Sequence, residues 1–179
     1  MRRFLVALAF CGLWLGTMSH GHAGETVQIA VDGQPRNYLL ERARNPGPRS
    51  TIIMFHGANG TSERVAQLTA LPVIAAQEGF TTVYPQARGP VWNRFLPGME
   101  SSQTREIFSR AGGIPNDIGF LKSLVADLVR RGVADPARIF IAGHSNGGFM
   151  ALTMFCNEGG LFAGIGLLTS AMMEQTGAE

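Results

Sequence analysis

One five-residue motif, Gly143-His144-Ser145-Asn146-Gly147, has the residue types needed for nucleophilic catalysis. It matches G-x-S-x-G, in which a serine occupies a sharp turn between a strand and a helix. An apolar run at 139–142 precedes the motif and a helical pattern at 148–157 follows it, which is the required context. Glycines two residues either side of Ser145 remove β-carbons that would collide with chain passing close to the turn. The motif predicts Ser145 as a nucleophile.

The alternative for this motif is a glycine-rich strand–helix turn that binds a phosphate group or nothing at all. Gly143, Gly147 and Gly148 do not have the spacing of a dinucleotide-binding loop, and no P-loop lysine follows them. A nucleotide-binding domain is therefore disfavoured.

A second motif, His56-Gly57-Ala58, follows an apolar run at 51–55 and could assist the serine. The tetrahedral intermediate of acyl transfer needs two N–H donors near the attacked carbonyl. One donor is expected from Asn146, directly after the serine, and the other from Gly57 or Ala58. The alternative is a plain strand-ending turn with a packed imidazole.

The rest of the chain predicts the elements that must position these two motifs. Residues 26–31 and 37–40 alternate in polarity around Asp32-Gly33, which predicts a hairpin at a sheet edge. Short apolar runs at 51–55, 80–84, 138–142 and 162–169 predict buried strands. A helical stretch at 62–78 is interrupted by Pro72, and the Gly- and Pro-rich segment 86–115 is expected to be a functional loop.

A further amphipathic helix is predicted from Asp117, taken as its N-cap, to Gly132, with a turn expected at 134–137. Strands alternating with helices after a hairpin predict an α/β fold with a mainly parallel sheet and helices on both faces. Sites in such folds form beyond the carboxyl ends of the strands, where both motifs lie.

The sequence resembles the family of poly(3-hydroxybutyrate) depolymerases and feruloyl-esterase-like enzymes, which are secreted α/β-hydrolases. The resemblance covers about residues 28–170 and rests on motifs spread along the chain: Phe55-His56-Gly57, Gly79-Phe80, Tyr84-Pro85, Trp92-Asn93, 117–121, 135–138 and 143–150. It implies an esterase that hydrolyses carboxylic esters, either polyhydroxyalkanoates or feruloyl and acyl esters of polysaccharide. It also implies Ser145 as the nucleophile and the His56-Gly57 region as the oxyanion loop.

The sequence departs from that family after the serine. Such enzymes carry Ser, Asp and His in that order, but no Asp or His follows Ser145. Neither His56, on the oxyanion loop, nor His144, expected to point away from the hydroxyl, is a credible general base. We therefore expect residues 24–179 to be a partial α/β-hydrolase domain, truncated at the C-terminus and with little or no turnover.

Residues 1–23 have the pattern of a signal peptide. Arg2 and Arg3 precede an apolar stretch of about 12 residues, too short to span a bilayer, and small residues precede a cleavage point after Ala23. A secreted or periplasmic location follows. Cleavage leaves 13 basic and 13 acidic residues, so charge gives no reason to expect binding to nucleic acid or a stable membrane association.

Three smaller assignments concern a cysteine, a tryptophan and bound groups. Cleavage removes Cys11, and Cys156 is expected to be a buried, inert thiol unless its partner lies outside this sequence. Trp92 is expected either to line a substrate pocket, together with His56, or to pack in the core. No motif implies a metal or a cofactor, and nothing in the sequence indicates the oligomeric state.

The rival function is a non-catalytic secreted protein that keeps the pocket for a ligand.

Overall fold

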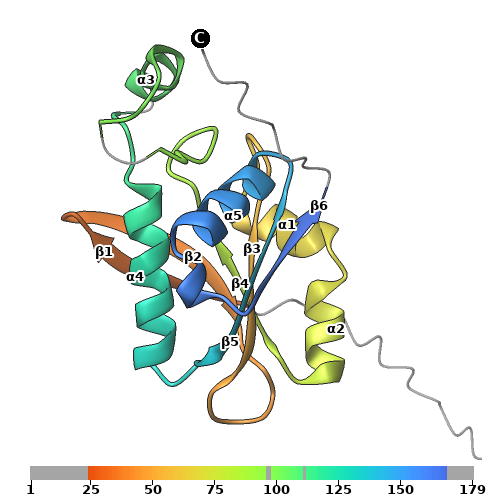
Figure 1. Cartoon of the computed structure of the whole chain (residues 1–179). Coiled ribbons are helices and arrows are strands. Elements are labelled where there is room, and N and C mark those ends of the chain that lie inside the picture. The colour runs from red at the N-terminus through yellow and green to blue at the C-terminus, as the bar shows by residue number, and fades with distance from the viewer. Residues whose placement is uncertain (1–23, 96–97, 111, 169–179) are drawn as a thin grey trace, which may run out of the picture.

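The fold is built on one six-stranded sheet (Figure 1). The computed structural model describes residues 24–95, 98–110 and 112–168. The strand order is β1-β2-β4-β3-β5-β6. The β1–β2 and β2–β4 pairs are antiparallel, and the other three pairs are parallel. The mainly parallel sheet predicted from the sequence is confirmed.

The predicted hairpin is formed by β1 (Glu25–Val31) and β2 (Gln34–Glu41), at one edge of the sheet. Asp32 and Gly33 connect the two strands with φ angles of 51° and 73°. Positive φ at both central residues is the turn geometry whose twist matches that of paired strands. The Asp-Gly signal in the sequence was therefore sufficient to place this turn.

The strands of the parallel part are β3 (Arg49–Phe55), β4 (Thr81–Pro85), β5 (Ala134–His144) and β6 (Gly164–Leu168). Phe55 at the end of β3 pairs with Gly143 near the end of β5. Because parallel strands end on the same side of a sheet, the loop after β3 and the turn after β5 are neighbours. The sheet thus brings together the two motifs that the sequence singled out.

Helices cover both faces of the sheet, as predicted. The face carrying α1 (Ser62–Leu68) and α2 (Leu71–Glu78) has a small core formed by Met54, Val65, Ala66 and Tyr84. The face carrying α4 (Asp117–Arg130) and α5 (Asn146–Asn157) has the main core, which includes Ile53, Phe55, Ile139 and Ile141. Pro72 lies in the first turn of α2, where a missing N–H costs nothing.

Several boundaries differ from the sequence prediction by one to three residues, and two segments differ in type. The segment 86–115 contains a helix, α3 (Ser102–Ser109), whose weak apolar pattern buries Phe108. Residues 134–137 belong to β5 rather than to a turn, because Ala134 pairs with Arg49 and an irregularity in register accommodates the next residues. Strand β4 begins one residue later than predicted and includes Pro85. A short 3-10 helix, η1 (Gly159–Leu161), precedes β6.

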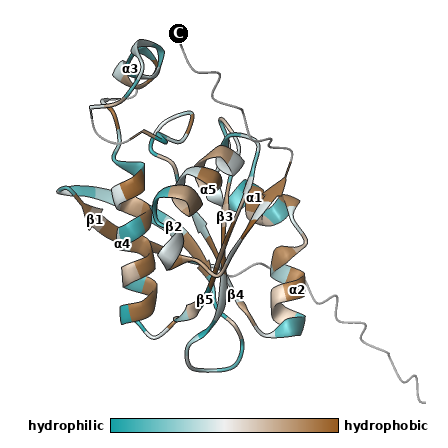
Figure 2. Cartoon of the chain, in the orientation of Figure 1, coloured by the Kyte–Doolittle hydropathy of each residue, from teal (hydrophilic) through white to brown (hydrophobic). Residues whose placement is uncertain are grey.

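The strands β5 and β6 are less buried than their apolar sequences predicted. Phe140 and Leu167 are each 37% exposed and Leu168 is 45% exposed, although Figure 2 shows that this part of the sheet is hydrophobic. The helices α1 and α2 pack on β2, β3 and β4, so they leave Phe140 uncovered. The prediction of fully buried strands at this edge was wrong because an apolar run does not reveal which helix covers it.

The assignment of Cys156 as a buried thiol was also wrong, since its side chain is exposed. Helix α5 turns Met150, Ala151 and Met154 toward the sheet. Cys156 follows Met154 by two residues, about 200° around the helix, and so faces away. In the described part of the chain, no helix is long and apolar enough to cross a membrane.

Candidate active site

Ser145 occupies a strained turn between β5 and α5. Its φ is 52° and its ψ is −120°, a conformation that costs a residue with a β-carbon about 1–3 kcal/mol and is found mostly at functional sites. Its backbone N–H donates to the Leu168 carbonyl at 3.1 Å, which holds the turn against β6. The serine is half-buried and borders a cavity.

The two glycines of the motif are required by backbone contacts. A β-carbon on Gly143 would lie 2.2 Å from the Gly147 carbonyl oxygen. A β-carbon on Gly147 would lie 2.5 Å from the carbonyl oxygens of Phe55 and His56. Neither backbone can move aside, because each belongs to a paired strand or to the turn itself. The steric role predicted for these glycines is confirmed.

The loop after β3 lies directly against the serine turn. A β-carbon on Gly57 would lie 3.0 Å from Nδ1 of His144 and 3.5 Å from the β-carbon of Ser145. The Gly60 N–H donates to the Gly57 carbonyl at 3.1 Å, closing a turn that contains Asn59 with a φ of 55°. Ala58, at the exposed tip of this turn, borders the same cavity as Ser145.

The backbone N–H of Asn146, which the sequence predicts to be an oxyanion donor, lies at the start of α5. Asn146 is the first residue of α5, where backbone N–H groups have no partner within the helix. The structure therefore gathers Ser145, Asn146, Gly57 and Ala58 at one end of the sheet. Their roles as nucleophile and donors remain proposals.

His56 is a buried structural residue that borders the cavity. Its Nε2 accepts from the Ala87 backbone N–H at 3.2 Å, which leaves the proton on Nδ1 to donate to the Gly57 carbonyl at 2.8 Å. Burial lowers the pKa of His56 below its usual value, so the ring stays neutral near pH 7. Both ring nitrogens are engaged, so His56 is poorly placed to act as a base.

His144 is exposed and borders the cavity, and the direction of its ring relative to the serine hydroxyl stays a prediction.

Trp92 is buried in the core, with 3% of its surface exposed. Its ring meets Phe55 edge-on at 5.4 Å between centroids, and its indole N–H donates to the His56 carbonyl at 2.9 Å. Its backbone N–H donates to Oδ1 of Asn146 at 2.8 Å. Of the two roles predicted for Trp92, these observations favour core packing over lining a substrate pocket.

A buried ion pair anchors the loop that carries Trp92. Asp117 is fully buried, and its Oδ1 lies 2.5 Å from Nη2 of Arg36 on β2. Its Oδ2 accepts from the Asn93 backbone N–H at 2.7 Å. The N-cap of α4 is Asn116, whose side chain accepts from the Gly119 N–H. The assignment of Asp117 as the N-cap was wrong, because its carboxylate binds Arg36 and Asn93 instead. The sequence could not reveal a partner 81 residues away.

The cavity beside Ser145 has a volume of about 440 Å³. Apolar side chains from β3, α1 and β6 form part of its wall: Met54, Val65, Leu68 and Leu168. Arg64 and Thr61 add polar groups at the start of α1. An apolar cavity with a few polar groups and a serine at its border has the composition of a small-molecule site.

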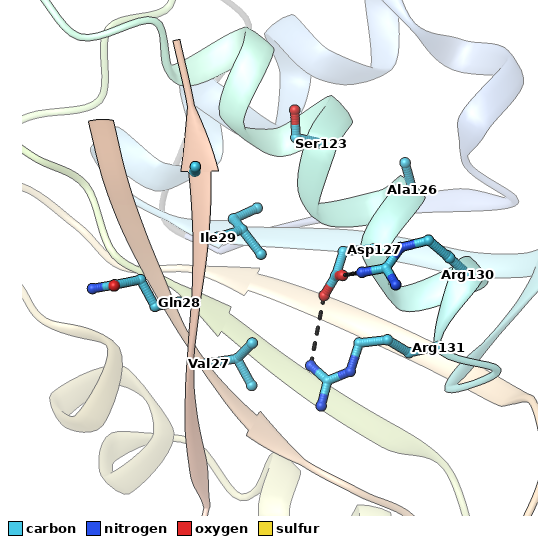
Figure 3. Close-up of a pocket in the computed structure, with 9 residues that line it drawn as sticks. Val27, Gln28, Ile29, Ser123, Ala126, Asp127, Arg130 and Arg131 are labelled. Atoms are coloured by element: carbon cyan, nitrogen blue, oxygen red, sulfur yellow. Dashed lines mark hydrogen bonds and ion pairs between the residues drawn. The ribbon is translucent and has the colours of Figure 1, made fainter. Parts of the chain in front are cut away.

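A larger cavity of about 650 Å³ lies elsewhere, between β1 and α4 (Figure 3). The charged groups on its α4 side are engaged with one another: Asp127 pairs with Arg130 and with Arg131, and Arg131 also reaches Glu25. Ser123, the residue on its wall that carries a hydroxyl group, lies within α4 rather than on a strand–helix turn. Size alone would select this cavity, but the chemistry favours the cavity beside Ser145.

Residues 146–179 contain neither Asp nor His, the residue types that serve as acid and base in serine hydrolases. Across residues 24–95, 98–110 and 112–168, no cluster of three or more His, Cys, Asp or Glu side chains is placed to hold a metal ion.

Comparison with solved structures identifies the fold. An acetyl xylan esterase from Aspergillus awamori matches 86% of this chain with a TM-score of 0.61 at 20% identity. An S-formylglutathione hydrolase from Staphylococcus aureus matches 79% with a TM-score of 0.60 at 14% identity. The chain has the α/β-hydrolase fold. It spans 56% and 54% of those two chains.

The similar sequences are those of esterases, although no family model matches the chain. A putative esterase, NocK, from Nocardia uniformis subsp. tsuyamanensis is 24% identical over 142 residues, which are 77% of this chain and 39% of the relative. Acetylxylan esterase A from Aspergillus oryzae is 27% identical over 123 residues, 68% of this chain and 36% of the relative. The likeness to esterases is thus established at the general level, over less than two fifths of either relative's length.

Proposed function

We propose that this α/β-hydrolase chain carries the nucleophile and the oxyanion-binding groups of a carboxylic ester hydrolase. The observation that carries the proposal is the backbone strain at Ser145, held at the border of a cavity with the Gly57 loop packed against it. In the proposed reaction, the Ser145 oxygen attacks the ester carbonyl carbon. The N–H of Asn146 and that of Gly57 or Ala58 donate to the developing oxyanion.

The tetrahedral intermediate then expels the alcohol and leaves an acyl group on Ser145, which water hydrolyses. The hydroxyl proton must leave at the first step, and the 179 residues place no Asp–His pair after the serine to accept it. Oxyanion binding without a complete triad still accelerates hydrolysis about 10³- to 10⁴-fold over water. We therefore expect slow turnover that rises with pH, because hydroxide replaces the general base.

For the substrate, we propose an ester of an acyl group with a polysaccharide, or a polyhydroxyalkanoate. The acetylxylan esterases among the relatives support the first, and the motif resemblance described above supports both. The apolar wall formed by Met54, Val65 and Leu168 suits the acyl group of such an ester. We further propose export through residues 1–23, and N-terminal sequencing of exported protein should begin at Gly24.

Hydrolysis of p-nitrophenyl acetate by the 179-residue protein tests the proposal. We expect a slow rate above that of buffer, lost in Ser145→Ala and kept in Ser123→Ala, a control on α4. Equal rates in the wild type and Ser145→Ala would contradict the assignment of the nucleophile. Turnover of about 10 s⁻¹, a typical enzyme value, would contradict the absence of an activating base.

A non-catalytic binding protein is the second candidate, supported by the hydrogen bonds that engage both ring nitrogens of His56 and leave it poorly placed as a base. Such a protein would bind an acylated oligosaccharide in the cavity with the same affinity in the wild type and Ser145→Ala. It would not react with a fluorophosphonate. Covalent labelling of Ser145 would exclude this candidate.

A further inference from the structure

Trp92 joins the two chain segments that surround the proposed oxyanion site. Its indole N–H binds the His56 carbonyl, next to Gly57, and its backbone N–H binds the Asn146 side chain, next to Ser145. One residue therefore contacts the segments that hold both sets of proposed donors. We propose that Trp92 is a positioning residue, which sets the separation between the N–H of Asn146 and the N–H groups of Gly57 and Ala58.

The loop that carries Trp92 is itself fixed to the body of the fold. The neighbouring Asn93 donates its backbone N–H to Asp117 at 2.7 Å and its side-chain amide to the Pro115 carbonyl at 2.9 Å. Asp117 is held by Arg36, whose guanidinium also lies 4.0 Å from the centre of the Phe120 ring. The same loop also binds the segment after β3, because the Asn59 N–H donates to the Pro90 carbonyl at 2.7 Å. The loop thus braces the donor segments against β2 and α4.

The physical consequence concerns the transition state, and it rests on the proposed function of Ser145. Two donors stabilise an oxyanion only when both lie within hydrogen-bond distance of the same oxygen. A misplacement of about 1 Å at a reacting centre can cost about 100-fold in rate. Donors that act only in the transition state affect the chemical step and leave ground-state binding unchanged. Loss of the Trp92 contacts should therefore slow the reaction of Ser145 without weakening the first encounter with an ester-like reagent.

Trp92→Phe tests the inference, because it keeps an aromatic ring against Phe55 and removes the N–H that binds the His56 carbonyl. The measurement is the reaction of the 179-residue protein with a fluorophosphonate, resolved into a binding constant and a maximal rate of inactivation. We expect the rate to fall by about tenfold or more and the binding constant to change by less than about twofold.

Tyr38→Phe is the matched control. It also removes one buried donor, the hydroxyl between β2 and α4 that donates to Asp127 at 2.7 Å and accepts from Arg131 at 2.9 Å. Both variants remove a hydrogen bond between buried groups, so both should unfold at a lower urea concentration than the wild type. The inactivation rate of Tyr38→Phe should stay within about twofold of the wild type, because that hydrogen bond lies outside the donor segments.

Asn146→Ala provides a second variant in case Trp92→Phe does not fold. It removes the acceptor of the Trp92 backbone N–H, at the other end of the same bridge. We expect a similar fall in rate, and a double variant no slower than the product of the two single effects. Unchanged rates in both single variants would overturn the role of Trp92 while leaving Ser145 as the nucleophile. Failure of the wild type to react would overturn both proposals together.

Discussion

Two neighbouring regions of this fold differ in how tightly their residues are packed. The interlocked region, residues 55–60, 92–93 and 143–148, is held by backbone contacts and buried hydrogen bonds. The open edge, β6 with the adjacent Phe140, exposes apolar side chains on strands that the sequence predicted to be buried. Both regions border the Ser145 turn, since Leu168 of β6 accepts its backbone N–H.

The difference in packing follows the requirements of the proposed reaction, which needs fixed backbone groups in only one of the two regions. An oxyanion site needs N–H groups at fixed places, so the interlocked region leaves no room for a β-carbon at Gly143 or Gly147. The open edge contributes apolar surface to the cavity and one backbone hydrogen bond, from the Ser145 N–H to the Leu168 carbonyl. Substitutions should therefore be costly in the first region and mild in the second.

The largest effect is expected from Asp117→Ala, which removes the anchor of the interlocked region. The variant leaves the buried Arg36 guanidinium without its carboxylate, and breaking such a pair costs about 3–5 kcal/mol. Urea unfolding followed by circular dichroism measures the loss. Glu106→Ala, which breaks the exposed pair with Arg110, is the control and should leave the unfolding midpoint unchanged. Equal midpoints in the two variants would mean that the buried pair does not support the loop.

Gly147→Ala is expected to lower the free energy of unfolding by about 3 kcal/mol. Overpacking usually costs about 1–3 kcal/mol, and a backbone that cannot move places this variant at the upper end of that range. The added β-carbon would lie 2.5 Å from two carbonyl oxygens. Gly160→Ala is the matched control, since nothing lies within 4 Å of a β-carbon there. If both variants unfold at the same urea concentration, the close packing of β3 on the serine turn is refuted.

A smaller effect is expected from a pair of variants on β5 that compares the two sheet faces directly. Ile141 is 1% exposed and Phe140 is 37% exposed, although the two residues are adjacent. Ile141→Ala should cost at least about 2 kcal/mol, and Phe140→Ala less than about half of that despite the larger ring removed. A greater loss for Phe140→Ala would show that the open edge is covered in solution.

The smallest effect concerns pH. Burial holds the pKa of folded His56 below its unfolded value, so the unfolded chain binds more protons once the pH falls below about 6.5. The stability is complete above that pH and declines as the pH falls toward the folded pKa. Melting temperatures at pH 7.5 and 5.5 should show this decline in the wild type and a smaller one in His56→Gln. An identical decline in the variant would assign the pH dependence to other groups.

How much of this could be predicted from the sequence depends on the range of the interaction. The hairpin at Asp32-Gly33, the four later strands and the steric role of Gly143 and Gly147 are local patterns, and all are confirmed. The Arg36–Asp117 pair joins residues that are 81 positions apart in the sequence. The contact between Trp92 and Asn146 joins residues that are 54 positions apart. No periodicity or motif encodes such pairings. The exposure of Phe140 and Cys156 likewise depends on which elements cover a surface, which a single sequence does not show.

The central claim is that Ser145 reacts as a nucleophile in the site formed by the interlocked region. After incubation with a fluorophosphonate, digestion with chymotrypsin should release residues 141–149, in which Ser145 is the one residue with a hydroxyl group. We predict that mass spectrometry finds the phosphonate adduct on this peptide in the wild type and in Ser123→Ala, and that Ser145→Ala carries none. An unmodified 141–149 peptide after prolonged incubation at high pH, or an adduct that persists in Ser145→Ala, would contradict the account.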